Sequence, residues 1–188
     1  MNRIALITFL ALGSAASLEA QATLILPDKP LPPAHARMQG AAYVLRDTLF
    51  AVTSAAARLQ RDFRTTSDAS LLSRARDVAA ACASAERNIA TPRTVLGETP
   101  ADTRLREREK QRLAGAYEKL AVATGTCVRE FQALTKPGQG EAIRGYGNRH
   151  ASNVVAEIRR YQSALDGYFR AMNIPNRPRG APENPLAG

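Results

Sequence analysis

The chain has 188 residues, with 26 Lys and Arg against 17 Asp and Glu, and its formal net charge is +9. It lacks the glycine-rich phosphate loop that follows a strand and the G-x-S-x-G motif of many hydrolases. Its composition therefore indicates a small basic protein and argues against the common nucleotide-binding and serine-hydrolase classes.

The first 22 residues are typical of a secretory signal peptide. Arg3 supplies a basic start, residues 4–18 are apolar, and Ala20-Gln21-Ala22 matches the small-x-small pattern read by signal peptidase. A membrane anchor needs roughly 20 apolar residues, so we expect cleavage after Ala22 rather than a transmembrane segment. The protein is then periplasmic or secreted, and its basic surface is directed at an anionic envelope polymer or a protein partner rather than nucleic acid.

Residues 23–33 form a proline-rich linker, and the first helix is expected to begin at Pro33 or Ala34, because proline suits the first turn of a helix. It should continue to the break at residues 65–68. Apolar residues recur along it at alternating steps of four and three, which is the period of an amphipathic helix. These residues are Met38, Ala42, Leu45, Leu49, Val52, Ala56, Leu59 and Phe63.

Three more helices are predicted from the same spacing. The second ends at Thr91-Pro92, the third opens with residues 99–102 and ends at residues 136–138, and the fourth follows a glycine-rich loop that runs to Gly147. Residues 173–188 are predicted to be a disordered tail, because they are polar and rich in proline. The fold class is thus all-α, with an up-down-up-down four-helix bundle over residues 34–172.

Cys82 and Cys127 fall on the apolar seams of the second and third helices, and they are the two cysteines of the chain. In an oxidising compartment such a pair predicts a disulfide. With the helix ends given above, the third helix must extend roughly 28 Å beyond the second. Residues 91–99 must then be nearly extended.

A basic row is expected on the third helix, on a face away from the Leu105 and Leu113 seam. One interpretation is a ladder for phosphate, sulfate or carboxylate groups. The other is a solvated face that Glu107 and Glu109 balance at i,i+3 spacing. Glu109 itself falls on the apolar seam, and we expect it to lie beyond the end of the bundle rather than to be a buried acid. The anion-binding candidates are Arg104, Arg108, Arg112 and Lys119.

A second stripe on the first helix comprises Tyr43, Phe50 and Ala57, spaced seven apart and outside the main seam. A bundle helix normally buries one such face. The stripe therefore predicts a contact with a second copy of the chain in a homodimer, with a partner, or with the linker residues Leu24–Leu26. Scattered exposed apolar residues are the alternative.

Neither metal nor cofactor binding is indicated. His35 and His150 begin the first and fourth helices, which run antiparallel, so they lie at opposite ends of the bundle and cannot share a metal ion. There is also no C-x-x-C-H for haem attachment. We expect a non-enzymatic exported bundle that binds an anionic envelope component or a protein partner. The alternative is a carrier of a small apolar ligand or cofactor between the helices, where several seam alanines could leave space.

Overall fold

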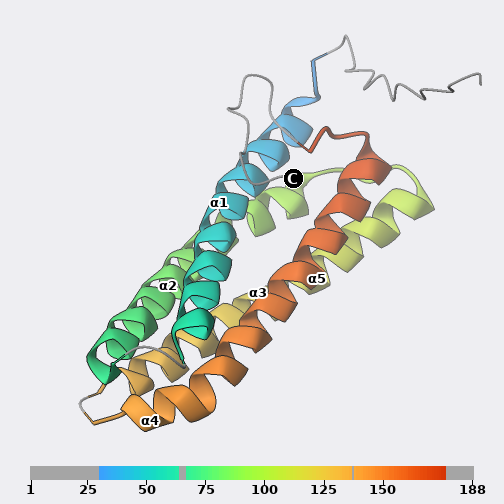
Figure 1. The fold of residues 1–188 in the computed structure, drawn as a ribbon. Coiled ribbons are helices and arrows are strands. Elements are labelled where there is room, and N and C mark those ends of the chain that lie inside the picture. Colours follow the sequence, from blue (N-terminus) through green and yellow to red (C-terminus); the bar gives the residue numbers. More distant parts are fainter. Residues whose placement is uncertain (1–29, 64–66, 137, 177–188) are drawn as a thin grey trace, which may run out of the picture.

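The computed structural model describes residues 30–63, 67–136 and 138–176 (Figure 1). The predicted signal peptide, linker residues 23–29 and tail residues 177–188 lie outside this part of the chain. The described residues are all-helical and contain no strand, and four long helices pack antiparallel, which confirms the predicted bundle. The elements are α1 (Pro33–Asp62), α2 (Asp68–Glu98), α3 (Arg104–Leu134), α4 (Gly140–Ala142), the π-helical turn η1 (Ile143–Gly147) and α5 (Asn148–Met172).

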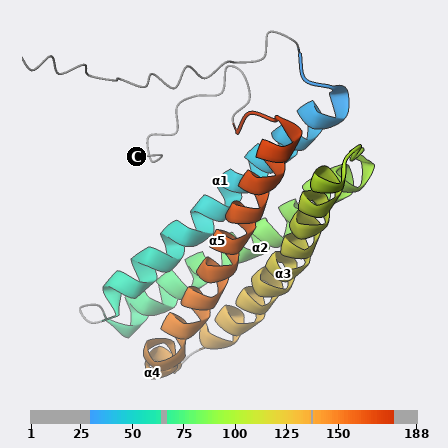
Figure 2. The same ribbon diagram turned by 90° about the vertical axis from the view of Figure 1, so that its right-hand side faces the viewer.

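Neighbours in the bundle follow the chain order. α1 packs on α2, α2 on α3 and α3 on α5, while the contact between α1 and α5 is smaller (Figure 2). Among the described helices, none combines the length and the apolar character that crossing a membrane requires.

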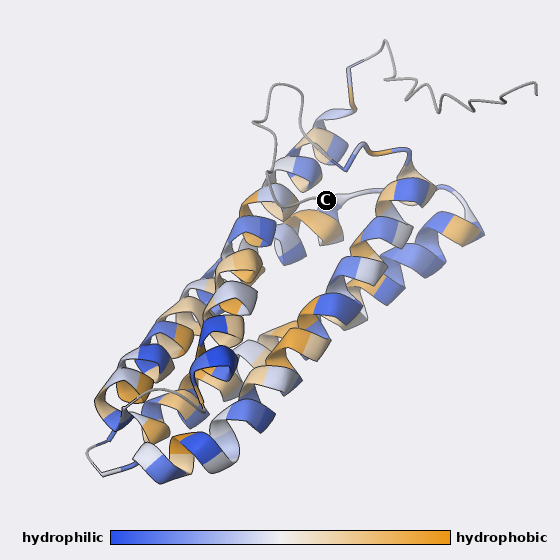
Figure 3. Cartoon of the chain, in the orientation of Figure 1, coloured by the Kyte–Doolittle hydropathy of each residue, from blue (hydrophilic) through white to orange (hydrophobic). Residues whose placement is uncertain are grey.

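The core is built from the apolar seams, and the polar residues mostly face outward (Figure 3). Leu45, Leu49 and Val52 of α1 are fully buried. Each such side chain gains about 1.5–3 kcal/mol by leaving water, so the seam spacing decides which face of each helix turns inward.

Tyrosines contribute an aromatic layer to the same core. Tyr117 of α3 and Tyr161 of α5 lie with ring centroids 5.0 Å apart, and their hydroxyl oxygens are 3.2 Å apart and share a hydrogen bond. Burial raises the pKa of both phenols far above the usual value. Burial also raises the pKa of Tyr168 on α5, against a smaller lowering by the Thr99 side chain.

The predicted end of the second helix at Pro92 is wrong, because α2 continues to Glu98 with Pro92 inside it. An internal proline removes one helical hydrogen bond and normally kinks or ends a helix. Here the apolar seam of α2 continues on both sides of Pro92, since Ile89 and Leu96 are 3% and 2% exposed. At the end of α2, Glu98 pairs with Arg37 of α1 at 3.1 Å. Tertiary packing therefore outweighs the local signal.

The longer α2 also reduces the predicted overshoot. The third helix begins later than expected, at Arg104, and its N-cap is Thr103, whose hydroxyl accepts a hydrogen bond from the Arg106 amide. The stretch from Cys82 to the end of α2 is roughly 24 Å long, and that from the start of α3 to Cys127 is roughly 35 Å. The difference of about 11 Å is about two fifths of the predicted 28 Å. The predicted extended conformation of residues 91–99 is wrong, because residues 91–98 belong to α2.

The predicted glycine-rich loop is helical from Gly140 onward. Ile143 is fully buried in η1, and Gly147 lies against the Phe63 ring. Arg144 also holds this segment to the start of α2 through an ion pair with Asp68 at 2.8 Å. These contacts hold the segment from Gly140 onward in a helical conformation, and Gly138 before it has a left-handed φ of +81°.

The prediction of a disordered tail is wrong for residues 173–176, which are the part of the tail that the structure describes. Asn173 ends α5 in the left-handed conformation, and Ile174 is 4% exposed. The Pro175 carbonyl accepts a hydrogen bond from Gln39 at 2.7 Å, and the Asn176 carbonyl accepts one from Arg46 at 3.4 Å. The chain after α5 is thus fastened to α1.

Candidate functional site

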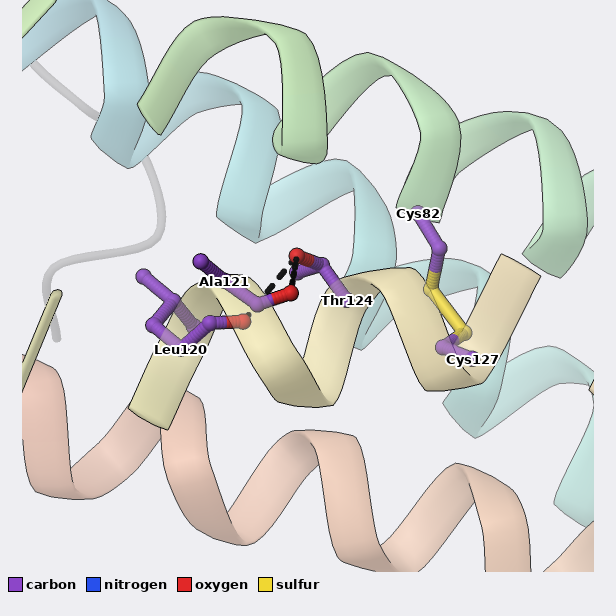
Figure 4. Close-up of a disulfide and its surroundings, with 5 residues drawn as sticks. All are labelled: Cys82, Leu120, Ala121, Thr124 and Cys127. Carbon is purple, nitrogen blue, oxygen red and sulfur yellow. Dashed lines mark hydrogen bonds between the residues drawn. A yellow bond between two sulfur atoms is a disulfide. The ribbon is translucent and has the colours of Figure 1, made fainter. Parts of the chain in front are cut away.

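The predicted disulfide is confirmed. Cys82 and Cys127 are bonded, with Cα atoms 6.1 Å apart, and they join α2 to α3 (Figure 4). One turn before Cys127, the buried Thr124 hydroxyl is bonded to the Leu120 and Ala121 carbonyls of its own helix. With both sulfur atoms in the bond and both residues buried, neither cysteine offers a free thiol for nucleophilic or metal chemistry.

The basic row lies on the surface of α3. All four members, Arg104, Arg108, Arg112 and Lys119, are exposed. Arg108 and Arg112 each approach Glu109, whereas Arg104 and Lys119 have no side-chain partner in the part of the chain that the structure describes. The four side chains therefore lie on the exposed surface of α3.

Glu109 does not lie beyond the end of the bundle, so that expectation is wrong. It is 8% exposed and lies between α3 and α5. The reason is Gly167 of α5, where an added Cβ would come within 2.9 Å of Glu109 Oε2. The absence of a side chain at Gly167 allows α5 to cover the carboxylate.

Glu109 links the two central arginines of the row. Arg108 Nη2 donates a hydrogen bond to Oε1 at 3.2 Å, and Arg112 Nη1 is 3.6 Å from Oε2. Oε2 accepts no hydrogen bond within the described residues, although it is buried. A buried carboxylate thus anchors two exposed guanidinium groups from below.

Lys119 is about two helical turns from Arg112, the nearest arginine of the row. It lines a surface groove of about 510 Å³ between α3 and α5, whose floor includes Ala123 and Val154. Val122, on the same groove, is 68% exposed. The row therefore consists of a compact arginine group and one lysine beside an apolar groove.

The two histidines lie at opposite ends of α3, as predicted. His35 is near Asp102 and Arg106, where its pKa is lowered mainly by burial and further by the Arg106 charge. His150 lies edge-on to Phe131, and its Nε2 is 3.7 Å from Glu130. Within the ranges that the structure describes, there is no group of three or more His, Cys, Asp or Glu side chains that could hold a metal ion.

The second stripe on α1 is only partly covered. Tyr43 is half-buried, Phe50 is 44% exposed and Ala57 is exposed. Gln39 and Arg46, which hold the segment after α5, lie one turn on either side of Tyr43. The segment after α5 therefore runs along the same part of α1 as Tyr43, which the sequence did not suggest. The linker residues Leu24–Leu26 lie outside the described residues.

Changing Tyr43 and Phe50 together to serine is expected to lower the free energy of unfolding by about 2 kcal/mol, the cost of exposing part of an aromatic contact. Urea unfolding with sedimentation on the full mature chain measures both stability and assembly. A loss well under 1 kcal/mol, with assembly unchanged, would show that the two rings only decorate the surface. Conversion of a dimer to a folded monomer would assign the stripe to a second copy.

No family model, curated protein or solved structure matches the chain. The side chains themselves therefore carry any functional assignment. Sequence reasoning overlooked one residue of the candidate site, Gly167. A glycine inside a helix costs roughly 0.5–1 kcal/mol relative to alanine, so its place inside the predicted fourth helix was a signal of close packing.

Proposed function

We propose that the protein is a non-enzymatic bundle that binds an anionic polymer of the cell envelope through the basic row on α3. Arg104, Arg108 and Arg112 rise along one face at intervals of about 6 Å. Each guanidinium offers five N–H donors in a fixed plane, which suits oxyanions better than a lysine ammonium does. A row of such groups can contact successive charged groups of one polymer.

The observation that carries this proposal is how the two neighbouring acidic residues, Glu107 and Glu109, are paired. Glu107 makes no ion pair with the row among the described residues, and its carboxylate accepts a hydrogen bond from the Gln111 amide at 2.8 Å. Glu109 is then the one carboxylate paired with the row among the described residues. The row keeps an excess of positive charge at the surface, which favours a polyanion site over a balanced, solvated helix face.

Reversing the charge of Arg104, Arg108 and Arg112 to glutamate is expected to abolish retention of the mature protein on immobilised polyphosphate. Retention of the unchanged protein should also weaken steeply as salt rises, because exposed charges are screened over about 8–10 Å near physiological ionic strength. Chromatography over a salt gradient measures both effects.

A matched control reverses Arg58, Arg76 and Arg87, which are exposed on α1 and α2. It changes the net charge by the same amount and should reduce retention only slightly. Equal losses in the two triple variants would show that net charge alone governs binding. Retention that does not depend on salt would contradict the proposal.

A further inference from the structure

We propose that Glu109 holds Arg108 and Arg112 as a paired site for one tetrahedral oxyanion, a phosphate or sulfate group of the bound polymer. This inference rests on the proposed function, because it names the chemical group that the basic row recognises. Glu109 acts here as a positioning residue, and the two arginines make the contacts.

The first step concerns the burial of Glu109. A carboxylate taken out of water loses its hydration, and its buried oxygen atoms need hydrogen bonds to offset that loss. Glu109 Oε2 has none within the described residues, and its ion pair with Arg112 is as long as 3.6 Å. An ion pair as long as this, made with a guanidinium group that is 56% exposed, contributes little to stability. The arrangement is thus poorly explained as a device for stability alone.

The second step concerns what fixes the carboxylate. Gly167 brings the α5 backbone against Glu109 Oε2, so the side chain has little room to turn away from α3. Arg108 and Arg112 are 73% and 56% exposed while Glu109 is nearly buried. The guanidinium groups therefore cover the carboxylate, and Glu109 limits how far they swing apart.

The third step concerns the donors that remain. Arg108 uses one N–H for its hydrogen bond to Glu109, and Arg112 makes none that meets hydrogen-bond geometry. Their side chains are four residues apart on a helix, where neighbours are about 5–6 Å from each other. Most N–H groups of both arginines remain available to a ligand on the solvent side.

The chemistry of the ligand follows from the number of guanidinium groups. One guanidinium satisfies both oxygen atoms of a carboxylate in a bidentate pair. Two of them on adjacent turns suit a group with more acceptor oxygens and more charge. A phosphate monoester on the polymer, or the phosphate at a chain end, carries three strong acceptor oxygens and about −1.5 to −2 charges. Lone carboxylates are then the weaker ligands of this site.

The test measures the affinity of the full mature chain for inorganic pyrophosphate by calorimetry in Glu109→Gln and Glu107→Gln variants. Both changes remove one negative charge from the same helix. If Glu109 positions the arginines, Glu109→Gln should weaken binding about tenfold, the effect of misplacing one charge-assisted hydrogen bond. Glu107→Gln should leave binding unchanged or slightly tighter. Tighter binding by both variants would overturn the inference, because summed charge would then explain the affinity.

A second pair of variants changes no charge. Gly167→Ala places a methyl group 2.9 Å from Glu109 Oε2, so the end of the carboxylate must move away from α5 to admit it. It should weaken pyrophosphate binding as Glu109→Gln does. Gly115 lies on α3 between Arg112 and Lys119, and an added Cβ there meets nothing within 4 Å. Gly115→Ala should therefore leave pyrophosphate binding unchanged. Equal behaviour of the two alanine variants would contradict the positioning role.

The choice of polymer separates this inference from the proposed function. Retention on polyphosphate and on dextran sulfate should exceed retention on polyglutamate at equal salt. Equal, salt-dependent retention on all three would leave the basic row as a general polyanion site and overturn the oxyanion inference. Retention that falls as salt rises but does not change when the three arginines are reversed would instead contradict the proposed function.

Discussion

Replacing Cys82 and Cys127 together by alanine is expected to lower the free energy of unfolding by about 4 kcal/mol, the chain-entropy value for closing a loop of this length. The two cysteines are 45 residues apart in sequence and join α2 to α3. Without the bond, the unfolded chain regains the freedom that the loop removes. Single domains are typically stable by about 5–15 kcal/mol, so the loss would be a large fraction of the total.

Urea unfolding followed by circular dichroism measures this loss. Reduction of the unchanged protein, which keeps the two sulfur atoms in the core, should give a similar decrease. Adding the same reductant to the double alanine variant should have no effect, because the chain has no other cysteine. If the reduced and oxidised proteins unfold at the same urea concentration, the disulfide does not stabilise the fold by restricting the conformations of the unfolded chain.

The disulfide also shows which features of the fold could be predicted. The seam spacing predicted the helices. The bond was predicted from the two cysteines of a chain expected to be exported, and the positions of Cys82 and Cys127 on two of the seams agreed with it. This succeeded because burial of an apolar stripe dominates helix packing, and the stripe is visible in the sequence.

Local signals were less informative where tertiary contacts oppose them. Pro92 and the glycines after Gly138 both indicated a chain break, yet Pro92 lies inside α2, and helix resumes at Gly140. In each case buried neighbours, Ile89 and Leu96 or Ile143, supply the stabilisation that the local sequence lacks. Such contacts join residues far apart in the chain, so no local pattern reveals them.

The candidate site was predictable in part for the same reason. The exposed row on α3 followed from helical periodicity. The position of Glu109 did not, because it depends on Gly167 lying across from it on α5. A carboxylate on an apolar seam is ambiguous until the helix that covers it is known.

The core tyrosines lead to an expected loss of stability at alkaline pH. The unfolded chain releases its phenol protons near pH 10. In the folded protein, burial raises the pKa of Tyr117 and Tyr161 far above that value. The folded state therefore binds more protons than the unfolded state above pH 10, and stability falls as pH rises. Below pH 10 both states keep the protons, and the contribution is fully present.

The expected magnitude follows from the number of retained protons. Each buried tyrosine costs about 1.4 kcal/mol of stability for every pH unit above 10, so the two together should remove about 3 kcal/mol by pH 11. Urea unfolding at pH 8, 10 and 11 measures the decrease, and the Tyr117→Phe/Tyr161→Phe variant should lose about 3 kcal/mol less than the unchanged protein over this range. A single Tyr117→Phe change should give about half of that difference. Parallel curves for the three proteins would show that the two hydroxyls reach water in the native state and are not sealed between α3 and α5.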